Sequence, residues 1–313
     1  MTTRQFSVEN APTGASARLD RFLADRFPEY SRSYFQQLLK QGAVALNGKK
    51  AEKDARVKKG DSISVAFREK EDITLAPDST VPFRIIADEK EFVVVDKPAG
   101  VVVHPSATHK KGTLVNGLLA RWPGLHTVGE SPVRPGIVHR LDKETSGLMV
   151  IAKTPEMFLW LKKQFQDRRV EKKYTALVFG KLARLAGAIS APIARVGARQ
   201  VAVGDRRTGA EKKIREAETV FRVLKSYSGA TLVEVMPKTG RMHQIRVHFK
   251  HIGHPIVGDK TYAPPCLFKS VPCARQFLHA GFLTFPLPDG RTVSFFSPLP
   301  EDLGTVLAGL EKK

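Results

Sequence analysis

The sequence predicts an α+β protein in which a small helix–helix–hairpin module precedes a larger domain with a mixed, largely antiparallel sheet. Two amphipathic segments stand together near the start of the chain, at residues 17–27 and 31–42. The rest of the 313 residues holds many strand-like segments and few helix-like ones, without the regular alternation that parallel α/β folds show. We expect domains at residues 15–75 and 85–305, joined by a linker at 76–84.

The N-terminal module carries clear helix and turn signals. In "ARLDRFLADRF" the apolar residues recur at helical spacing. In "SRSYFQQLLKQG" Ser31 is placed to cap a helix and Gly42 to end it. The segment "VALNGKKA" runs through an Asn47-Gly48 turn, and "SISVAF" alternates polar and apolar residues as a half-buried strand does. These signals predict two helices followed by a hairpin.

The larger domain begins with β-branched segments on both sides of a turn at residues 97–100, which predicts a strand on each side. A helix is expected after Thr154, because Pro155 fits the first helical position and the following apolar residues share one face. Further strands are expected at residues 147–153, 173–179, 217–224, 230–236, 243–249 and 291–296.

The charge balance indicates a polyanionic partner. The chain has 51 Lys and Arg against 31 Asp and Glu, a net charge of +20. Residues 1–75 hold 14 basic and 10 acidic residues, so +4 lies there and +16 in the remainder. An excess of this size favours nucleic acid over a merely solvated surface. The larger domain is therefore also expected to touch the polyanion.

Other classes of protein and site are disfavoured. The two cysteines, Cys266 and Cys273, are too few for a disulfide framework and lack zinc-ligand spacing, which favours a reducing cytoplasm. The sequence contains no apolar run of membrane-spanning length and no signal peptide at the start. Four histidines cluster near the C-terminal third, but no cysteine or carboxylate accompanies them at ligand spacing, so no metal is expected: His243, His248, His251 and His254.

In "IVHRLDKETSGLMVIAKT", residues 137–154, charged residues lie between two apolar runs. Burying charge is costly unless the charge is paired. In an extended chain Arg140 and Asp142 would face one side, and His139 would face the other. An Arg-x-Asp pair alone is more often a structural ion pair than a catalytic one, so the residues by themselves leave both interpretations open.

The whole phrase "GIVHRLDKETSGLMVIAKT" closely resembles the signature of the RluA/RluD-type pseudouridine synthases. Four further segments resemble that family's motifs in the family's order: "VVVDKPAGVVVHPS", "EKKYTALVFG", "KTGRMHQIRVHFKHIGHPIVGDKTYA" and "RQFLHAGFLTFPLP". They extend over residues 85–300, and "TYAPP" departs from the family where relatives have glycine after the tyrosine. The N-terminal pattern "RLD.FL…SRS" to "LNG" resembles an S4 RNA-binding domain.

The resemblance implies a cofactor-independent, metal-free enzyme that isomerises uridine to pseudouridine in RNA. It identifies Asp142 as the catalytic carboxylate, Tyr174 as the active-site tyrosine and Arg140 as the residue that replaces the flipped base. The resemblance implies that an arginine of "KTGRMHQIRVHFKHIGHPIVGDKTYA" pairs with Asp142, and it favours Arg246 over Arg241. If residues 243–249 form a strand, alternation places these two arginines on opposite faces. Arg241 is then an RNA-binding candidate.

The expected partner is structured RNA. An S4 domain and the RluD-like phrases favour large-subunit ribosomal RNA, with transfer RNA as the alternative, and a monomer is expected. In the N-terminal module the RNA-binding candidates are Arg32, Lys40 and Lys49.

Two rival functions are a non-catalytic RNA-binding or ribosome-assembly factor and a nucleoside or glycoside hydrolase. The hydrolase would need a second carboxylate near Asp142, for which Glu144 is a weak candidate.

Overall fold

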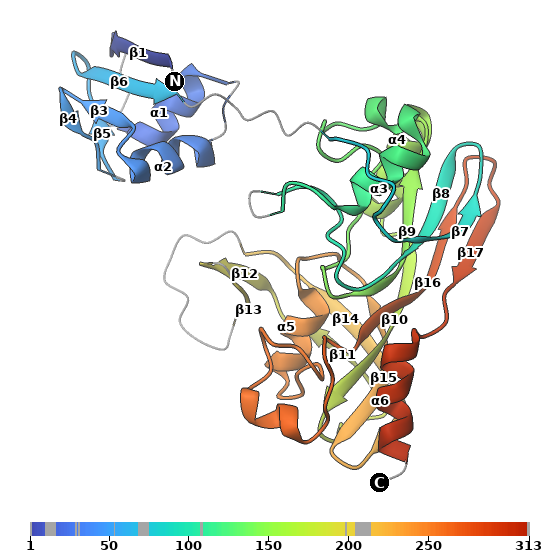
Figure 1. Cartoon of the computed structure of the whole chain (residues 1–313). Helices are drawn as coiled ribbons and strands as arrows, with labels where there is room; N and C mark the ends of the chain where they lie inside the picture. Colours follow the sequence, from blue (N-terminus) through green and yellow to red (C-terminus); the bar gives the residue numbers. More distant parts are fainter. Residues whose placement is uncertain are drawn as a thin grey trace. The chain divides into compact units, whose positions relative to one another are not determined.

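The computed structural model of the chain describes residues 2–9, 17–28, 30, 32–52, 54–67, 75–106, 109–197, 199–203 and 214–311. Its mixture of helices with a large mixed sheet confirms the α+β class (Figure 1). The chain forms two compact units, Met1–Asp72 and Ile73–Lys313. None of the described helices has both the length and the apolar character needed to cross a membrane.

The first unit packs two helices on a small sheet whose strand order is β1-β6-β3-β4. Side chains of β6 alternate between partly exposed and buried, and Ile63 and Val65 enter a core with Leu23 and Phe35. The predicted helix capped by Ser31 is present as α2, but Ser31 itself lies outside the described residues. Its elements are β1 (Thr2–Ser7), β2 (Ala17–Arg18), α1 (Leu19–Arg26), α2 (Arg32–Gln41), β3 (Val44–Leu46), β4 (Lys49–Lys50), β5 (Arg56–Val57) and β6 (Ser62–Phe67).

The second unit is built on one large sheet, with strand order β11-β14-β15-β10-β16-β9-β8-β7 and β17 paired to β16. The β16–β9 pair is parallel and its neighbouring pairs are antiparallel, as predicted for a mixed sheet. The elements are β7 (Arg84–Asp88), β8 (Phe92–Lys97), α3 (Leu114–Arg121), η1 (Pro123–Thr127), β9 (Ser146–Ala152), α4 (Pro155–Gln166), β10 (Glu171–Phe179), β11 (Ala186–Ser190), β12 (Ile193–Val196), β13 (Arg199–Ala202), β14 (Glu218–Tyr227), β15 (Ala230–Pro237), α5 (Gln244–His251), η2 (Pro265–Lys269), β16 (Leu278–Pro286), β17 (Thr292–Phe296) and α6 (Glu301–Glu311).

Strand β9 is the buried centre of this unit, and all seven of its residues are buried. Alternate side chains enter two different apolar clusters: Met149 faces the one that contains α3, and Val150 faces the one that contains α4. Gly147 sits near the start of β9 with φ of +124°, and a Cβ there would lie 2.4 Å from the carbonyl oxygen of Ala280 in β16. Only glycine allows this approach. This close contact with β16 fixes where the loop that precedes β9 joins the sheet.

Two sequence predictions about this unit are wrong. Residues 243–249 lie mainly in helix α5 and form no strand. Residues 101–103 form no strand either, because the carbonyls of Val102 and Val103 instead accept the N–H groups of Leu114 and Val115 at the start of α3. Within residues 76–84, the segment expected as a linker, Val81 is 8% exposed and packs in the second unit's core.

Candidate active site

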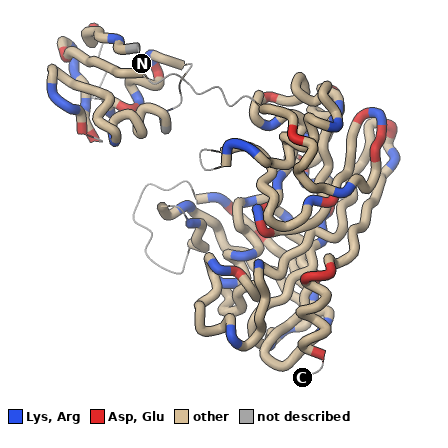
Figure 2. The backbone as a smooth tube through the Cα atoms, viewed as in Figure 1, with Lys and Arg blue, Asp and Glu red and all other residues tan. Residues whose placement is uncertain are grey.

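A basic cleft of about 1050 Å³ opens in the second unit beside the loop that precedes β9. Its lining contains nine Lys and Arg residues and three Asp and Glu residues. Figure 2 shows that Lys and Arg residues are distributed along the backbone of both units. A groove with this charge balance attracts a polyanion. The basic residues are Arg134, Arg140, Lys162, Arg168, Lys172, Lys173, Lys238, Arg241 and Arg246.

Asp142 lies in that loop and lines the cleft, with its side chain 18% exposed. Its Oδ2 accepts a hydrogen bond from Nη1 of Arg246 at 2.9 Å. A charge-assisted bond of this kind balances the carboxylate and fixes one of its two oxygens. The other oxygen, Oδ1, accepts no hydrogen bond within the described residues.

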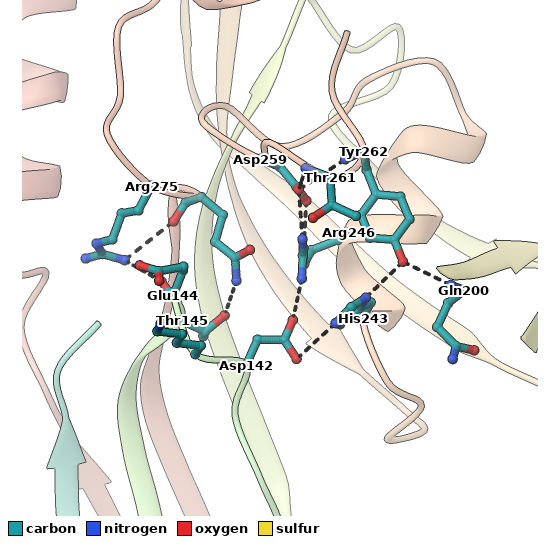
Figure 3. A network of polar contacts seen from close by, with 12 residues as sticks. Asp142, Glu144, Thr145, Gln200, His243, Arg246, Asp259, Thr261, Tyr262 and Arg275 are labelled. Atoms are coloured by element: carbon teal, nitrogen blue, oxygen red, sulfur yellow. Dashed lines mark hydrogen bonds and ion pairs between the residues drawn. The ribbon is translucent and has the colours of Figure 1, made fainter. Parts of the chain in front are cut away.

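Arg246 comes from helix α5 and is held from behind by a second carboxylate. Its Nε and Nη2 donate to Asp259 at 2.6 and 2.8 Å, and the Asp259 side chain is fully buried. Asp259 also accepts the backbone N–H groups of Thr261 and Tyr262 (Figure 3). Burial by itself lowers the pKa of Arg246, but the bonds and charges of Asp259 and Asp142 outweigh it and raise the pKa. The guanidinium therefore stays charged between two carboxylates.

The loop around Asp142 is anchored by buried polar side chains. Lys97 is fully buried, and its Nζ donates to the carbonyls of Pro98, Val101 and Lys143 at 2.7, 3.0 and 3.1 Å. Burial lowers the pKa of Lys97 to about 7. On the other side Arg275 donates to the carbonyl of Glu144 at 3.1 Å. These bonds hold the residues that directly follow Asp142.

A histidine lies on the free side of the carboxylate. Nε2 of His243 is 3.9 Å from Oδ1 of Asp142 (Figure 3). Nδ1 of His243 lies 2.9 Å from the hydroxyl of Tyr262, and that hydroxyl accepts the backbone N–H of Gln200 at 3.2 Å. Burial lowers the pKa of His243, so its ring is neutral near pH 7. Asp142, His243 and Arg246 thus meet at one point of the cleft.

Tyr174 and Arg140 line the same cleft as Asp142. Tyr174 stands on the central strand β10 and is 8% exposed. Burial raises the pKa of Tyr174, and the charge of Asp142 raises it further, so the phenol is protonated. Arg140 is exposed, and within the described residues its side chain makes no hydrogen bond or ion pair.

The remaining residues of these motifs have structural contacts. His139 stacks on Phe165 at 4.7 Å, and its Nε2 accepts the backbone N–H of Val150 at 3.0 Å. Burial lowers the pKa of His139 to about 3, as expected for a neutral acceptor. Arg241 lines the cleft but donates to the carbonyl of Glu216 at 3.0 Å, not to Asp142. The reason given for separating Arg241 from Arg246, strand alternation, is wrong because Arg246 lies on a helix.

The candidates in the first unit lie on its helix and hairpin. Lys40 is exposed in the last turn of α2, and Lys49 is exposed in β4. Arg32 is partly committed, because its Nε donates at 3.0 Å to the buried carboxylate of Asp20. Gln36 donates to the same carboxylate at 2.7 Å. Arg32 therefore contributes to the fold of the unit whatever else it binds.

No group of three or more His, Cys, Asp and Glu side chains in the described part of the chain is arranged to hold a metal ion. The histidines that cluster in the sequence have other contacts in the structure. His248 Nε2 bonds to the carbonyl of Ala191, and His254 Nδ1 bonds to that of Phe179.

Sequence reasoning did not find three of the residues that build this site. In the sequence Asp259 and Tyr262 stand within a family motif without a predicted role of their own, and His243 suggests only a possible metal ligand. Asp259 lies 13 residues beyond Arg246. The one signal available was the run of polar residues in "GDKTY" after a buried apolar pair, which marks a loop with buried polar groups.

Comparison with known proteins gives consistent matches along the chain. A model described as RNA pseudouridylate synthase matches residues 91–251, and one described as S4 domain matches residues 17–63. A protein of Aquifex aeolicus named uncharacterized RNA pseudouridine synthase is 40% identical and covers 98% of this chain and 97% of its own length. The ribosomal large subunit pseudouridine synthase D of Nitrosomonas europaea is 38% identical, over 95% of this chain and 85% of its own.

Among solved structures, human RNA pseudouridylate synthase domain containing 4 superposes with a TM-score of 0.57 and 28% identity. The match covers 73% of this chain and 93% of the human one. Human RNA pseudouridylate synthase domain containing 1 gives the same TM-score and identity over 76% of this chain and 98% of its own.

Proposed function

The chain belongs to the RNA pseudouridylate synthase family, and from that premise we propose that it isomerises uridine to pseudouridine in large-subunit ribosomal RNA with Asp142 as the catalytic carboxylate. That it is an RNA pseudouridine synthase with an S4 domain follows from the family and confirms the resemblance stated from the sequence. The RNA substrate, the aspartate and the absence of a cofactor are the proposal.

The observation that carries the proposal is the arrangement of Asp142, Arg246 and Asp259 in a basic cleft. The cleft suits a polyanion, yet it contains a carboxylate whose charge is balanced by a buried arginine. Such a carboxylate is costly to maintain and has little use in a passive RNA-binding surface. It fits a reaction in which positive charge develops on a sugar carbon.

The isomerisation places clear demands on these residues. The N1–C1′ bond of uridine breaks, the base turns, a C5–C1′ bond forms, C5 loses its proton and N1 gains one. Asp142 either attacks C1′ or removes the C2′ proton to give a glycal, and both routes need its free oxygen Oδ1 to reach the sugar. Because atoms and electrons balance between uridine and pseudouridine, the reaction consumes no redox or group-carrying cofactor.

Arg140 and Tyr174 have roles that match their exposure. A uridine within folded RNA must leave its stack before its sugar can reach Asp142. Arg140 is exposed and its planar guanidinium can stack in the vacated place. Tyr174 is a buried neutral phenol on the cleft wall, suited to stack on the flipped base rather than to accept a proton.

Ribosomal RNA is proposed over transfer RNA because relatives that align with nearly the whole chain are named ribosomal large subunit pseudouridine synthase D. The S4 unit, with exposed Lys40 and Lys49, is proposed to add affinity and placement on a large structured RNA. We propose the domain boundaries from the sequence with one change: residues 76–84 belong with the catalytic domain, since Val81 is part of its core.

The experiment is to map pseudouridines across all RNAs of the source cells with the gene intact, deleted, and restored. At least one pseudouridine in large-subunit ribosomal RNA should disappear on deletion and return with the restored gene. Loss confined to transfer RNA would overturn the choice of substrate. An unchanged map, with no activity of the purified protein on ribosomal RNA, would leave a non-catalytic RNA-binding factor as the better description.

A further inference from the structure

His243 occupies the free side of the catalytic carboxylate, and none of the roles above uses it. We propose that its Nε2–H binds the ribose 2′-hydroxyl of the target uridine, so that this residue makes the site distinguish a ribonucleotide from a deoxyribonucleotide at the reacting position. The inference deepens the proposed function and rests on it. It stands on a gap of defined size, on the orientation of the imidazole and on the backbone at residue 243 (Figure 3).

The gap lies between Nε2 of His243 and Oδ1 of Asp142, which are 3.9 Å apart. This is too long for a direct hydrogen bond. If an oxygen atom lies about 2.8 Å from each of them, a normal hydrogen-bond length, the Nε2···O···Oδ1 angle is roughly 90°. Such an oxygen can accept from Nε2–H and donate to Oδ1 at the same time. A hydroxyl group does both, as does a water molecule that a substrate hydroxyl would displace.

The contacts of Tyr262 favour the imidazole tautomer of His243 that carries its hydrogen on Nε2. Its hydroxyl accepts the backbone N–H of Gln200, so the phenolic hydrogen remains to be donated. Within the described residues the acceptor that it meets is Nδ1 of His243, at 2.9 Å. A neutral imidazole that accepts at Nδ1 carries its hydrogen at Nε2. Burial, which lowers the pKa of His243, keeps the ring in this neutral form. The N–H therefore faces the gap.

The backbone at His243 is unusual for a helix start. It is left-handed, with φ of 56° and ψ of 19°, a conformation that costs energy for any residue with a side chain. His243 precedes α5 but makes no side-chain capping bond. The side chain of Gln244, the first residue of α5, accepts the backbone N–H of Arg241, which precedes the helix. Helix capping therefore does not explain a histidine here, whereas a role in the cleft does.

The target nucleotide offers one hydroxyl. In an internal nucleotide of an RNA chain the 3′ and 5′ oxygens are phosphodiesters, so the 2′-hydroxyl is the sugar's remaining O–H. It is attached to C2′, next to the C1′ at which Asp142 is proposed to act. When Oδ1 of Asp142 reaches this sugar, the 2′-oxygen must lie close to the same atom. A 2′-hydroxyl is both donor and acceptor, as the gap requires.

The test is a cycle of two enzymes and two substrates. The probe is a large-subunit ribosomal RNA fragment that spans the uridine identified by mapping, with either uridine or 2′-deoxyuridine at that position. The enzymes are the parent and His243→Asn, because asparagine tolerates the left-handed backbone and keeps a polar group near Tyr262 but cannot reach the Nε2 position. Single-turnover rates at saturating enzyme give the chemical step, and rates at low enzyme give kcat/KM.

We expect the parent to lose at least about tenfold in kcat/KM from uridine to 2′-deoxyuridine through this bond, whereas His243→Asn loses about threefold or less. Because 2′-deoxy substitution also changes the intrinsic reactivity of the sugar, the comparison is between the two losses. His243→Gln, whose amide nitrogen reaches the Nε2 position, should restore part of the discrimination. Equal losses in the parent and His243→Asn would overturn the inference.

Two further measurements keep the test decisive. If His243→Asn does not fold, Tyr262→Phe replaces it: without the hydroxyl the imidazole is free to take either tautomer, and discrimination should fall by at least about threefold. Unchanged discrimination in Tyr262→Phe would contradict the proposed orientation of the ring. A parent enzyme that forms no pseudouridine in the uridine fragment overturns the proposed function itself, and this inference with it. If the parent forms pseudouridine but its loss on 2′-deoxyuridine does not depend on His243, the inference alone is overturned.

Discussion

Replacing Asp259 by asparagine removes the buried charge behind Arg246 while keeping the size of the side chain. Asp259 accepts from Nε and Nη2 of Arg246 at 2.6 and 2.8 Å and from two backbone N–H groups. An asparagine has one acceptor oxygen and an amide group that donates. That amide would face another donor, so at least one bond to the guanidinium is lost and Arg246 keeps a single carboxylate, Asp142.

The expected loss of stability is large because both groups are buried: the Arg246 side chain is 7% exposed and that of Asp259 is 0% exposed. Two unit charges about 4 Å apart at an effective dielectric constant of about 20 attract by about 4 kcal/mol. Removing one partner of a buried pair typically costs about 3–5 kcal/mol, because the other charge is left uncompensated. We therefore expect Asp259→Asn to lower the free energy of unfolding of the second unit by about 4 kcal/mol.

Urea unfolding followed by tryptophan fluorescence measures this quantity in the full chain. Both tryptophans, Trp122 and Trp160, lie in the second unit, so the signal reports on that unit and not on the S4 unit. The matched control is Glu311→Gln, which removes one charge from an ion pair with Lys225 whose side chains are 52% and 53% exposed. An exposed pair contributes at most about 1 kcal/mol.

Asp259→Asn should also form pseudouridine more slowly than the parent, because Arg246 loses the contact that orients it toward Asp142. A stability loss for Asp259→Asn no larger than that of Glu311→Gln would show that Asp259 is not the charged partner of Arg246. Full activity together with a loss of several kcal/mol would show that the pair stabilises the fold without positioning Asp142.

Three further predictions concern the two units. Burial raises the pKa of Asp20, but hydrogen bonds from the surrounding side chains outweigh it and bring the pKa from 3.8 to about 2. The ionised carboxylate therefore stabilises the first unit above about pH 4, and the unit's free energy of unfolding should fall by about 2 kcal/mol as the pH is lowered toward 2. Urea titrations followed by the NMR amide signals of residues 32–41 measure this change, and a profile that is flat with pH would contradict it. Gly147→Ala should lower the free energy of unfolding of the second unit by at least about 3 kcal/mol, because the new Cβ would lie 2.4 Å from a backbone oxygen. Gly290 has a φ of 87° but open space around it, so Gly290→Ala should cost only about 1 kcal/mol. Equal losses in the two variants would refute the steric reason. A chain that begins at Ile73 should keep the isomerisation step but bind ribosomal RNA at least about tenfold more weakly, and unchanged affinity and site choice would show that the S4 unit has no part in binding.

Much of the fold was predictable because local signals agreed with the tertiary structure. The first unit's helices and hairpin, strand β9, strand β10 and helix α4 all appear where apolar periodicity and turn residues place them. Helix α4 begins at Pro155 with Thr154 as its cap, and the Thr154 hydroxyl accepts the N–H of Met157. Where one face of an element is buried and the other solvated, the sequence reports it directly.

Helix α5 was missed for a reason tied to the site. In "QIRVHF" the apolar residues Ile245, Val247 and Phe249 alternate with polar ones, which is the pattern of a half-buried strand. In the structure all six residues from 244 to 249 are buried. The polar ones are buried because they make specific bonds, as Arg246 does with two carboxylates. Periodicity cannot distinguish a solvated polar residue from a buried, paired one.

The site itself was only partly predictable. Family motifs brought Asp142, Tyr174 and Arg246 to attention, and the structure places all three on one cleft. The supporting bonds could not be predicted, because they join segments far apart in the chain. Lys97 reaches the carbonyl of Lys143, and Arg275 reaches that of Glu144. Such contacts follow from the packing of the sheet and leave no local pattern.

The most direct measurement is pseudouridine formation and RNA binding by Asp142→Asn beside the parent, on the ribosomal RNA fragment that contains the mapped uridine. Asparagine keeps the shape of the side chain and removes the nucleophilic charge. We expect binding within about tenfold of the parent, roughly 1.4 kcal/mol, and no detectable pseudouridine, a loss beyond the 10²–10⁴-fold typical of general acid–base groups. If the parent forms pseudouridine and Asp142→Asn forms it at a similar rate, Asp142 is not the catalytic carboxylate.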